Sequence, residues 1–359
     1  MKTSSPNPPG VRKTLNIIFV TGLTLAILFL FLSPFAFMVF TSLKTQDQIS
    51  IVGAPIWPAQ PAKFEYNGKD VEVFTVPMAS CTGFEDETDT RNLAIIKKGT
   101  RESTYVDPDN LEQGEFVCAG AWRSLQRPWQ FAPTWENYTN AWNNIPGTYP
   151  RLLWNTTFYA LSSVVGVLIS TTLVAYGFSR FRFPGRDFLF VVLISTIFLP
   201  GFVTLIPTYT FFQKIGWVGT WLPLIVPAFF ANAYNVFLLR QYFMTLPREL
   251  DEAAKVDGAG PFRILWSVIL PQSYPALMAI TVFHIVYCWN DYFGPLIYLS
   301  TNRSAWPISV GLSTFNGIYG QQPQLIQAGA LMTLIAPLIL FLLAQRFFIQ
   351  GIVITGVDK

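Results

Sequence analysis

The chain has 359 residues, of which 51% are hydrophobic and 13% are charged, and its formal net charge is +3. A composition this apolar and this poor in charge excludes an ordinary soluble domain. The excess of basic residues lies beside long apolar blocks, where anionic lipid headgroups account for it, so the charge does not require a nucleic-acid partner.

Six blocks of the sequence are long and apolar enough to cross a membrane. Thr14 to Leu43, for example, contains no Lys, Arg, Asp or Glu, and a helix needs about 20 apolar residues to span the hydrocarbon core. We therefore predict an all-α polytopic membrane protein with six transmembrane helices. The predicted spans are about 15–40, 153–178, 188–212, 217–239, 276–299 and 325–345.

Basic residues near the span ends predict the orientation, because short cytoplasmic loops carry an excess of Lys and Arg. With six spans, most of these residues fall on one side, while the alternate short loops hold only Lys214 and Arg303. Both termini are therefore expected in the cytoplasm, and the first span is expected to remain as an anchor rather than to be cleaved as a signal peptide. The residues on the cytoplasmic side would be Arg12, Lys13, Arg180, Arg182, Arg186, Arg240, Arg248, Lys255, Arg263, Arg346 and Lys359.

Residues 46–150, between the first two spans, form the one large segment predicted outside the membrane. Lys63 to Val73 alternates apolar and polar residues around Asn67-Gly68, which indicates a β-hairpin because Asn-Gly fits a type I′ turn. A second hairpin is expected where Lys98-Gly99 separates two short strands. The segment therefore predicts a small β-rich module of roughly 60–70 residues, too small to be stable through its core alone.

Two cysteines lie in this segment, outside the cytoplasm, where disulfides persist. Cys81 and Cys118 are therefore expected to form a disulfide that stabilises the module; the alternative is a pair of free, buried thiols. Cys288 lies inside the fifth span and is expected to be a small packing residue.

The sequence lacks the motifs of an enzyme that could power transport. It has no Gly-x-x-x-x-Gly-Lys-Ser/Thr phosphate-binding loop, no Cys/His cluster with zinc spacing, and a single histidine. A serine or cysteine catalytic triad is equally unsupported. If the protein moves a solute against a gradient, the energy must come from another polypeptide or from an ion gradient.

The 240–275 loop is a polar segment between the fourth and fifth spans. Pro247 to Lys255 is expected to form a helix with acidic residues in its first turn. Gly258 would permit a tight reversal, and a second helix from Arg263 to Leu270 would end at Pro271. The apolar surface of this helix–turn–helix knob would comprise Ala253, Ala254, Val256 and Ala259.

The string from Glu252 to Ala259 resembles the EAA motif, the signature loop of the membrane subunits of ATP-binding-cassette (ABC) importers. By this resemblance the chain has the type I ABC importer permease fold, and the loop is a coupling helix that inserts into a cleft on the ATPase. The coupling residues would be Glu252, Ala253, Ala254, Asp257, Gly258 and Pro271. Strings that resemble the carbohydrate (maltose-type) permeases are Thr41–Lys44, Glu136–Tyr138, Tyr176–Phe183, Trp289–Leu296 and Gly351–Lys359. The alternative is that Glu252 is only a solvated carboxylate and the alanines are only helix formers.

The resemblance implies a permease subunit that translocates a sugar or a related polyol or oligosaccharide by alternating access. The implied partners are a second homologous permease, an ATPase dimer that binds ATP and Mg, an extracytoplasmic substrate-binding protein and membrane lipid. The implied location is the cytoplasmic membrane of a bacterium or archaeon, and no cofactor, metal or catalytic residue is expected in this chain. Open alternatives are import of another solute such as a glycerol phosphate, an ion-coupled secondary transporter, and a membrane-anchored adaptor.

The expected organisation is a cytoplasmic N-terminus and first span at 1–45, an extracytoplasmic insertion at 46–150 and a five-helix permease core at 151–359. The central part of the insertion, roughly 59–127, departs from the family, whose members usually join their first two spans by a short connection. The resemblance therefore implies no role for it. Our hypothesis is that it contacts a substrate-binding protein or the partner permease; the alternative is a module that only adds stability.

Polar residues inside the fifth span are candidates for the translocation path. His284, Cys288 and Asp291 are spaced at i, i+4 and i+7, so one face of a helix would carry all three. A metal site would lack a fourth ligand. Hydrogen bonding to neighbouring helices and a position on the path both remain open. The candidate path residues are His284, Asn290, Asp291 and Asn235.

Overall fold

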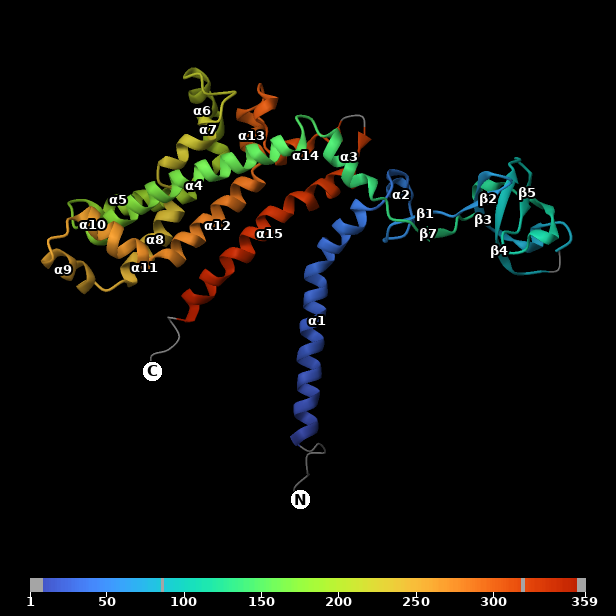
Figure 1. Ribbon diagram of the computed structural model, residues 1–359, viewed down its shortest axis with the longest axis horizontal. Helices are drawn as coiled ribbons and strands as arrows, with labels where there is room; N and C mark the ends of the chain where they lie inside the picture. The colour runs from blue at the N-terminus through green and yellow to red at the C-terminus, as the bar shows by residue number, and fades with distance from the viewer. Residues whose placement is uncertain (1–8, 85–86, 318–319, 354–359) are drawn as a thin grey trace. The chain divides into compact units, whose positions relative to one another are not determined.

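The structure, a computed structural model, describes residues 9–84, 87–317 and 320–353 (Figure 1). Residues 1–8 of the expected cytoplasmic N-terminus and residues 354–359 of the Gly351–Lys359 string lie outside the described residues. Contacts divide the chain into two units. The first comprises Met1–Thr139 with Gln322–Ala328, and the second comprises Asn140–Gln321 with Gly329–Lys359.

The first unit contains a long apolar helix and the β-rich insertion. Helix α1 (Pro9–Ser42) includes the first predicted span, and α2 (Gln46–Ser50) follows it. Strands β1 (Ala59–Pro61) and β7 (Trp129–Phe131) pair antiparallel, so the chain enters and leaves the insertion side by side. Between them lie β2 (Lys63–Tyr66), β3 (Lys69–Pro77), η1 (Met78–Ser80), β4 (Thr90–Lys97), β5 (Glu102–Val106), η2 (Leu111–Gln113), β6 (Glu115–Ala119) and η3 (Trp122–Ser124).

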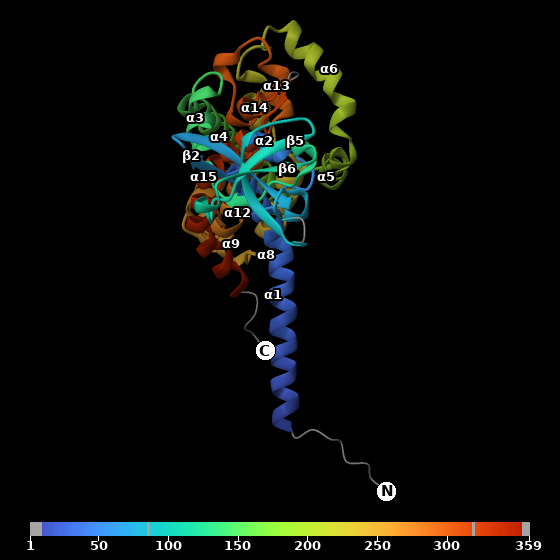
Figure 2. The same cartoon turned by 90° about the vertical axis from the view of Figure 1, so that its right-hand side faces the viewer.

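Strands β2 to β6 form one antiparallel sheet in sequence order, a simple meander. Asn67 and Gly68, at the β2–β3 turn, have φ values of 50° and 75°, the positive angles that a type I′ turn requires. The β2–β3 and β4–β5 pairs confirm both predicted hairpins. Figure 2 shows β5 and β6 side by side in this sheet.

The core of the insertion is small and lies around a disulfide. Phe74, Met78 and Tyr105 are buried in it, and burial of such side chains contributes about 1.5–3 kcal/mol each. Cys81 and Cys118 form a disulfide across a sequence separation of 37 residues and join the end of η1 to β6. A core of this size depends on such a covalent link.

A buried asparagine ties the end of α1 to the start of α3 (Glu136–Asn144). The last carbonyls of a helix have no partner within the helix. The Asn137 side chain donates to the carbonyl oxygens of Ser42 and Lys44, each at 2.8 Å, and the Tyr138 hydroxyl lies 2.9 Å from the Ser42 hydroxyl. The strings Thr41–Lys44 and Glu136–Tyr138 thus meet in one contact.

The second unit is helical and is arranged around α4 (Tyr149–Arg180), which packs against α7, η5, α8, α12 and α14. Helix α15 (Pro323–Val353) begins in the first unit and continues in the second. The remaining elements are α5 (Arg186–Ser195), η4 (Thr196–Phe198), α6 (Gly201–Lys214), α7 (Leu222–Ile225), η5 (Val226–Phe229), α8 (Ala233–Thr245), α9 (Glu249–Val256), α10 (Pro261–Ile264), η6 (Leu265–Ile269), α11 (Leu270–Gln272), α12 (Tyr274–Asn290), α13 (Phe293–Tyr298), η7 (Arg303–Ala305), α14 (Ile308–Ser313), β8 (Asn316–Gly317) and β9 (Gly320–Gln321).

Among the described residues, four helices are long and apolar enough to cross a membrane, and the number rises to six if each of two bent helix pairs counts as one span. The four are Asn16–Ser42, Tyr149–Arg180, Leu222–Thr245 and Pro323–Gln345. The bent pairs are Arg186–Phe198 with Gly201–Lys214, at 97°, and Pro261–Gln272 with Tyr274–Asn290, at 79°. The six predicted apolar segments are therefore helical, and the third, predicted at 188–212, is broken between Phe198 and Gly201.

Proline chemistry explains this break. Leu199 is extended, with ψ of 114°, and Pro200 follows it; the proline ring disfavours helical geometry in the preceding residue. Figure 2 shows α6 turning away from α5. The predicted fifth span, 276–299, is also divided, because α12 ends at Asn290 and α13 begins at Phe293.

Close approach between α4 and η5 depends on small side chains on α4. A Cβ atom at Gly166 would lie 2.6 Å from the Phe229 ring, so only glycine fits there without a shift. The Ser170 hydroxyl donates to the carbonyl oxygen of Ala228 at 3.1 Å and satisfies a backbone group of the irregular η5 segment. Together these contacts hold η5 against the middle of α4.

Loss of the disulfide should unfold the insertion without disturbing the helical unit. In a Cys81→Ser/Cys118→Ser variant, the insertion should lose about 3–4 kcal/mol of stability, the chain-entropy value for a loop of this length. Limited proteolysis of the full chain, with the cleavage sites mapped by mass spectrometry, should show new cuts within 62–128 and an intact 149–345 region.

Reductant provides the control for that measurement. It should reproduce the new cuts in the wild type and add nothing in the double variant. Protease resistance of the insertion in the double variant would contradict the role given to the disulfide.

Candidate functional site

The 240–275 loop folds as a helix–turn–helix knob in the second unit. Helix α9 ends at Val256, Gly258 reverses the chain with φ of +77°, and α10 begins at Pro261. Hydrogen bonds from the amide of Gly258 to Lys255 O and from the amide of Ala259 to Ala254 O, both at 2.9 Å, close the turn. The predicted organisation of this loop is confirmed, although the second helical stretch continues one residue beyond Pro271, to Gln272.

Most of the predicted coupling residues point outward. Glu252, Ala253, Asp257, Gly258 and Pro271 are exposed. Ala254 differs, because it is half-buried and packs against the core that contains Phe243 and Ile264.

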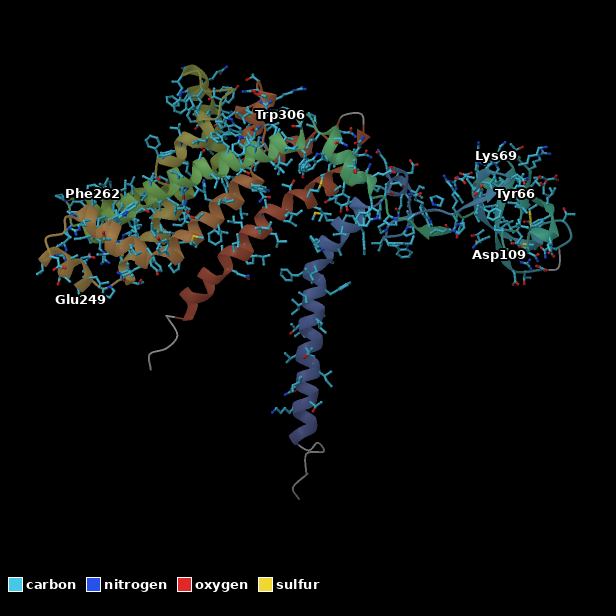
Figure 3. All side chains as sticks on the ribbon, in the orientation of Figure 1. Tyr66, Lys69, Asp109, Glu249, Phe262 and Trp306 are labelled. Atoms are coloured by element: carbon cyan, nitrogen blue, oxygen red, sulfur yellow. A yellow bond between two sulfur atoms is a disulfide. The ribbon has the colours of Figure 1, made fainter. Side chains whose placement is uncertain are left out.

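Apolar side chains accompany the exposed coupling residues. Val256 is 88% exposed, and Phe262, in the first turn of α10, is 78% exposed. Figure 3 shows Glu249 and Phe262 at one end of the second unit, with Trp306 toward the other end of α4. The knob thus presents exposed apolar side chains among exposed charged ones such as Glu249, Glu252 and Asp257.

A buried ion pair fixes the knob to α4. The Arg180 Nε atom lies 3.2 Å from Asp251 Oδ2, and the two side chains are 5% and 12% exposed. Arg180 also donates to the carbonyl oxygen of Leu246 at 3.1 Å, and the Tyr176 hydroxyl donates to that of Pro261 at 3.1 Å. The end of α4 therefore contacts the knob before, within and after α9.

Sequence reasoning missed this anchor. Arg180 belongs to the string Tyr176–Phe183 and Asp251 precedes Glu252, so both lay beside recognised motifs. Arg180 and Asp251 both lie next to apolar segments, and charged side chains are rarely buried there unless they are paired. This position was the signal that could have predicted the pair.

A cavity of about 780 Å³ opens where the broken helices meet α4 and α12. Non-helical backbone at membrane depth is tolerated where it is buried in protein or lines a cavity. Its lining residues are Tyr159, Ser163, Val167, Thr196, Pro223, Leu224, Pro227, Ala228, Phe230, Ala231, Asn232, Ala233, Tyr234, Asn235, Phe283, His284, Tyr287, Asp291, Gly294 and Tyr298. The cavity is large enough for a small ligand and combines aromatic faces with a few polar groups, as ligand sites do.

Hydrogen bonds orient the polar groups of the cavity. The Tyr159 hydroxyl donates to Asp291 Oδ2 at 2.9 Å, and the Gly294 amide donates to Asp291 Oδ1 at 3.1 Å. His284 Nε2 lies 2.6 Å from the Ser163 hydroxyl. Tyr159 and Ser163, which the sequence did not single out, thus hold the two ionisable groups that it did.

The structure brings three of the four predicted path residues to the cavity: His284, Asp291 and Asn235. Asn290 is absent from the described lining, and its amide donates instead to the carbonyl oxygen of Val286 at 2.8 Å. His284 and Asp291 thus line the same cavity, although α12 ends at Asn290 and Asp291 caps it with a ψ of 108°. Cys288 is buried beside Tyr159 and Ala160 as a packing residue.

Asn232, which also lines the cavity, caps α8 through hydrogen bonds to its side-chain oxygen from the amides of Tyr234 and Asn235. Among the described residues, no group of three or more His, Cys, Asp and Glu side chains is placed to hold a metal ion.

Known proteins share this architecture. A family model described as a binding-protein-dependent transport system inner membrane component matches residues 147–354. The osmoprotective compounds uptake permease protein of Synechocystis is 32% identical over 249 residues, which cover 69% of this chain and 83% of that relative. The sn-glycerol-3-phosphate transport system permease protein of Yersinia enterocolitica is 33% identical over 225 residues, which cover 61% of this chain and 79% of that relative.

A solved chain from a bacterial ABC transporter involved in the import of the acidic polysaccharide alginate has a TM-score of 0.62 with this structure, at 19% sequence identity. The match covers 96% of this chain and 100% of that chain, and it shows a shared fold. The region matched by the family model begins at residue 147 and leaves the β-rich insertion outside it.

The Arg180–Asp251 pair should be energetically coupled. Removing one partner of a buried ion pair costs about 3–5 kcal/mol because the other charge is left uncompensated, whereas apolar replacement of both is often neutral. We expect Arg180→Met and Asp251→Leu each to lower the melting temperature of the detergent-solubilised protein. The double variant should melt higher than either single variant.

An exposed pair in the same unit provides the control. Asp187 is 82% exposed and pairs with Arg186, so the same double-mutant cycle there should give a coupling energy of about 1 kcal/mol or less. Additive effects of the two changes at Arg180 and Asp251 on stability would contradict an energetic coupling between these side chains.

Proposed function

The chain belongs to the family of binding-protein-dependent transport system inner membrane components, and we propose on that premise how it works in its complex. It is an integral inner-membrane protein and the permease subunit of an ABC importer, whose ATPase is a separate subunit. We propose that its partners are a second, homologous permease, an ATPase dimer and an extracytoplasmic substrate-binding protein. ATP and Mg would be bound by the ATPase subunits, and none of the steps assigned to this chain requires a cofactor.

The proposed orientation has both termini in the cytoplasm. It is supported by basic residues at the ends of α4, α5 and α8 and in the 240–275 loop, because positively charged loops remain on the cytoplasmic side. Helix α1 would contact lipid or a partner, since the apolar window of this span has none of its residues buried within the chain. The 240–275 loop would then face the ATPase.

One observation carries the proposed mechanism: α4 links the knob to the cavity. Arg180, at the end of α4, binds Asp251 of the knob, and Ser163, on the same helix, lines the cavity. These two α4 residues are roughly 25 Å apart along a rigid helix, at about 1.5 Å per residue. A movement imposed on α9 by the ATPase would therefore be transmitted through α4 to the walls of the cavity, as alternating access requires.

We propose that the surface that contacts the ATPase comprises Glu252, Ala253, Val256, Asp257 and Gly258, with Phe262 beside them. Their exposure supports this proposal. Ala254 and Asp251 would act differently, since both face this chain and hold α9 in place.

The proposed cargo is a sugar or a related polyol or oligosaccharide. Tyrosine rings and hydroxyl groups around the cavity suit a polyhydroxylated solute. Another solute remains the alternative, since one relative is named for sn-glycerol-3-phosphate and another for osmoprotective compounds. An ion-coupled secondary transporter would require uptake that survives ATP depletion and is abolished by an ionophore.

We propose that the insertion contacts the extracytoplasmic binding protein or the partner permease. A preformed charged and aromatic patch supports this: Lys98 lies over the Trp122 ring at 4.7 Å, and Arg127 lies over the Phe74 ring at 5.2 Å. The hydrogen bond from Lys98 and the charge of Arg127 lower the pKa of Glu72, which therefore stays ionised between them at neutral pH. The Lys98 and Arg127 side chains remain 46% and 36% exposed, available to a partner.

A charge placed on the knob should uncouple transport. Val256→Glu should leave the fold intact, because Val256 is 88% exposed, but should bury an unpaired carboxylate against the ATPase. We expect ATP-dependent uptake and co-purification of the ATPase to fall by at least about tenfold at an unchanged membrane level. The matched control is Val52→Glu, at a valine that is 100% exposed in the first unit, which should leave both unchanged. Normal uptake and co-purification with Val256→Glu would contradict the proposed surface.

Excision of the insertion tests its role. Because Pro61 pairs with Trp129, residues 62–128 can be replaced by an Asn-Gly turn that joins β1 to β7 as a hairpin. The shortened chain should still assemble with the ATPase but show a weaker apparent affinity for the binding protein. Unaltered transport and unaltered affinity would leave the insertion with a stabilising role only. Lys98→Glu/Arg127→Glu in the full chain should reproduce the loss if the patch is the contact.

A further inference from the structure

Resting on the proposed function, we propose that Asp291 makes the cavity a charge filter. The cavity admits neutral polyhydroxylated solutes and disfavours anionic ones such as sugar phosphates and uronates. The inference deepens the proposed function by excluding one class of cargo, which includes the phosphate ester for which a similar permease is named.

The charges around the cavity are one-sided. Among the described residues that line it, Asp291 is the carboxylate, and none is Lys or Arg. His284 is the other strongly ionisable group, and an imidazole is mostly neutral above about pH 7. An anionic solute would therefore meet a carboxylate with no Lys or Arg among these described lining residues to offset it.

Asp291 cannot easily turn away from the cavity. Its two carboxylate oxygens accept hydrogen bonds from Tyr159 and from the Gly294 amide. Its own carbonyl oxygen accepts a hydrogen bond from Ser309 at 2.7 Å. A Cβ atom at residue 294 would lie 2.8 Å from Asp291 Oδ2, so the glycine at this position makes room for the carboxylate.

The rest of the cavity lining suits the uncharged ring of a sugar. Tyr159, Tyr234, Tyr287 and Tyr298 line the cavity. Tyr234 and Tyr287 are exposed and offer ring faces together with hydroxyl groups, whereas Tyr159 and Tyr298 are buried in its wall. Such groups can pack against the carbon faces of a sugar and bond to its hydroxyls without any need for charge. The tyrosines thus bind the features that neutral and anionic sugars share, and Asp291 distinguishes them.

A purely structural role for Asp291 makes a different prediction. Its bond to Gly294 resembles a helix cap at the start of α13, which an asparagine oxygen could accept equally well. Asp291→Asn therefore keeps an acceptor and removes the charge, whereas Asp291→Glu keeps the charge. If the residue acts only as a cap, Asp291→Asn should leave the choice of solute unchanged.

The test uses the complete transporter, with its binding protein, reconstituted in liposomes at pH 7.5. ATP-dependent uptake is measured for matched pairs of labelled solutes: trehalose with trehalose 6-phosphate, and glucose with glucuronate. The measured quantity is the ratio of anionic to neutral uptake in each variant, divided by that ratio in the wild type. Because the binding protein is the same throughout, its own preference cancels.

We expect the wild type to import a neutral member of the panel. Asp291→Asn should raise the anionic-to-neutral ratio by about tenfold or more, the effect of one charge at close range in a partly wet site. Asp291→Glu should keep the wild-type ratio. Asp187→Asn, which removes a carboxylate that is 82% exposed and outside the cavity lining, should also keep it.

A second variant keeps the test decisive if Asp291→Asn fails to fold. Thr196 is exposed and lines the cavity, so Thr196→Lys adds a cation there and should also raise the ratio. If neither variant changes the ratio, or if the wild type imports an anionic member as fast as its neutral partner, the charge filter is contradicted while the importer function stands. If the wild type imports no member of the panel, the proposed sugar cargo fails and the filter fails with it.

Discussion

The proposed transmission of movement from α9 to the cavity depends on the ion pair between Arg180 and Asp251. This pair joins a short helix with an unpartnered outer surface to the longest helix of the second unit. Without it, α9 would be connected to the membrane-embedded helices by loops and by the packing of Ala254 and Ala259. With it, a displacement of α9 would become a displacement of α4, which carries Tyr159 and Ser163 of the cavity lining.

A second constraint comes from the membrane itself, which offers no water to satisfy exposed backbone groups. The irregular stretches at η4–α6, at η5–α8 and at α12–α13 each contribute residues to the cavity. Side chains satisfy backbone groups there: Ser170 bonds Ala228, Asn232 caps α8, and Asp291 bonds Gly294. The same breaks that would be costly against lipid therefore provide polar groups at the place where a solute could pass.

Local patterns made much of the fold predictable from the sequence. Runs of apolar residues predicted the helical segments, Asn67-Gly68 predicted the first hairpin, and Gly258 predicted the reversal between α9 and α10. The coupling role proposed for Glu252 to Gly258 rests on the resemblance of that string to a known loop. Each of these depends on residues that are close together in the chain.

The remaining features depend on contacts between distant residues. Tyr159 on α4 donates a hydrogen bond to Asp291, a partner that helical spacing alone could not reveal. Arg180 and Asp251 each lie beside a recognised motif, but no pattern in the neighbouring sequence indicates that they are partners. Asn290 bonds its own helix instead of facing the cavity. The bends of 97° and 79° within two of the predicted spans are likewise not readable from apolar runs.

The central claim is that this chain works as one half of an ATP-driven permease. The most direct measurement is affinity purification of the chain from its native membrane in mild detergent, followed by mass spectrometry of the intact complex. We expect recovery of an ATPase dimer and a second, homologous permease, with a substrate-binding protein in addition. Recovery of the chain alone, or of a homodimer without any ATPase, would contradict it.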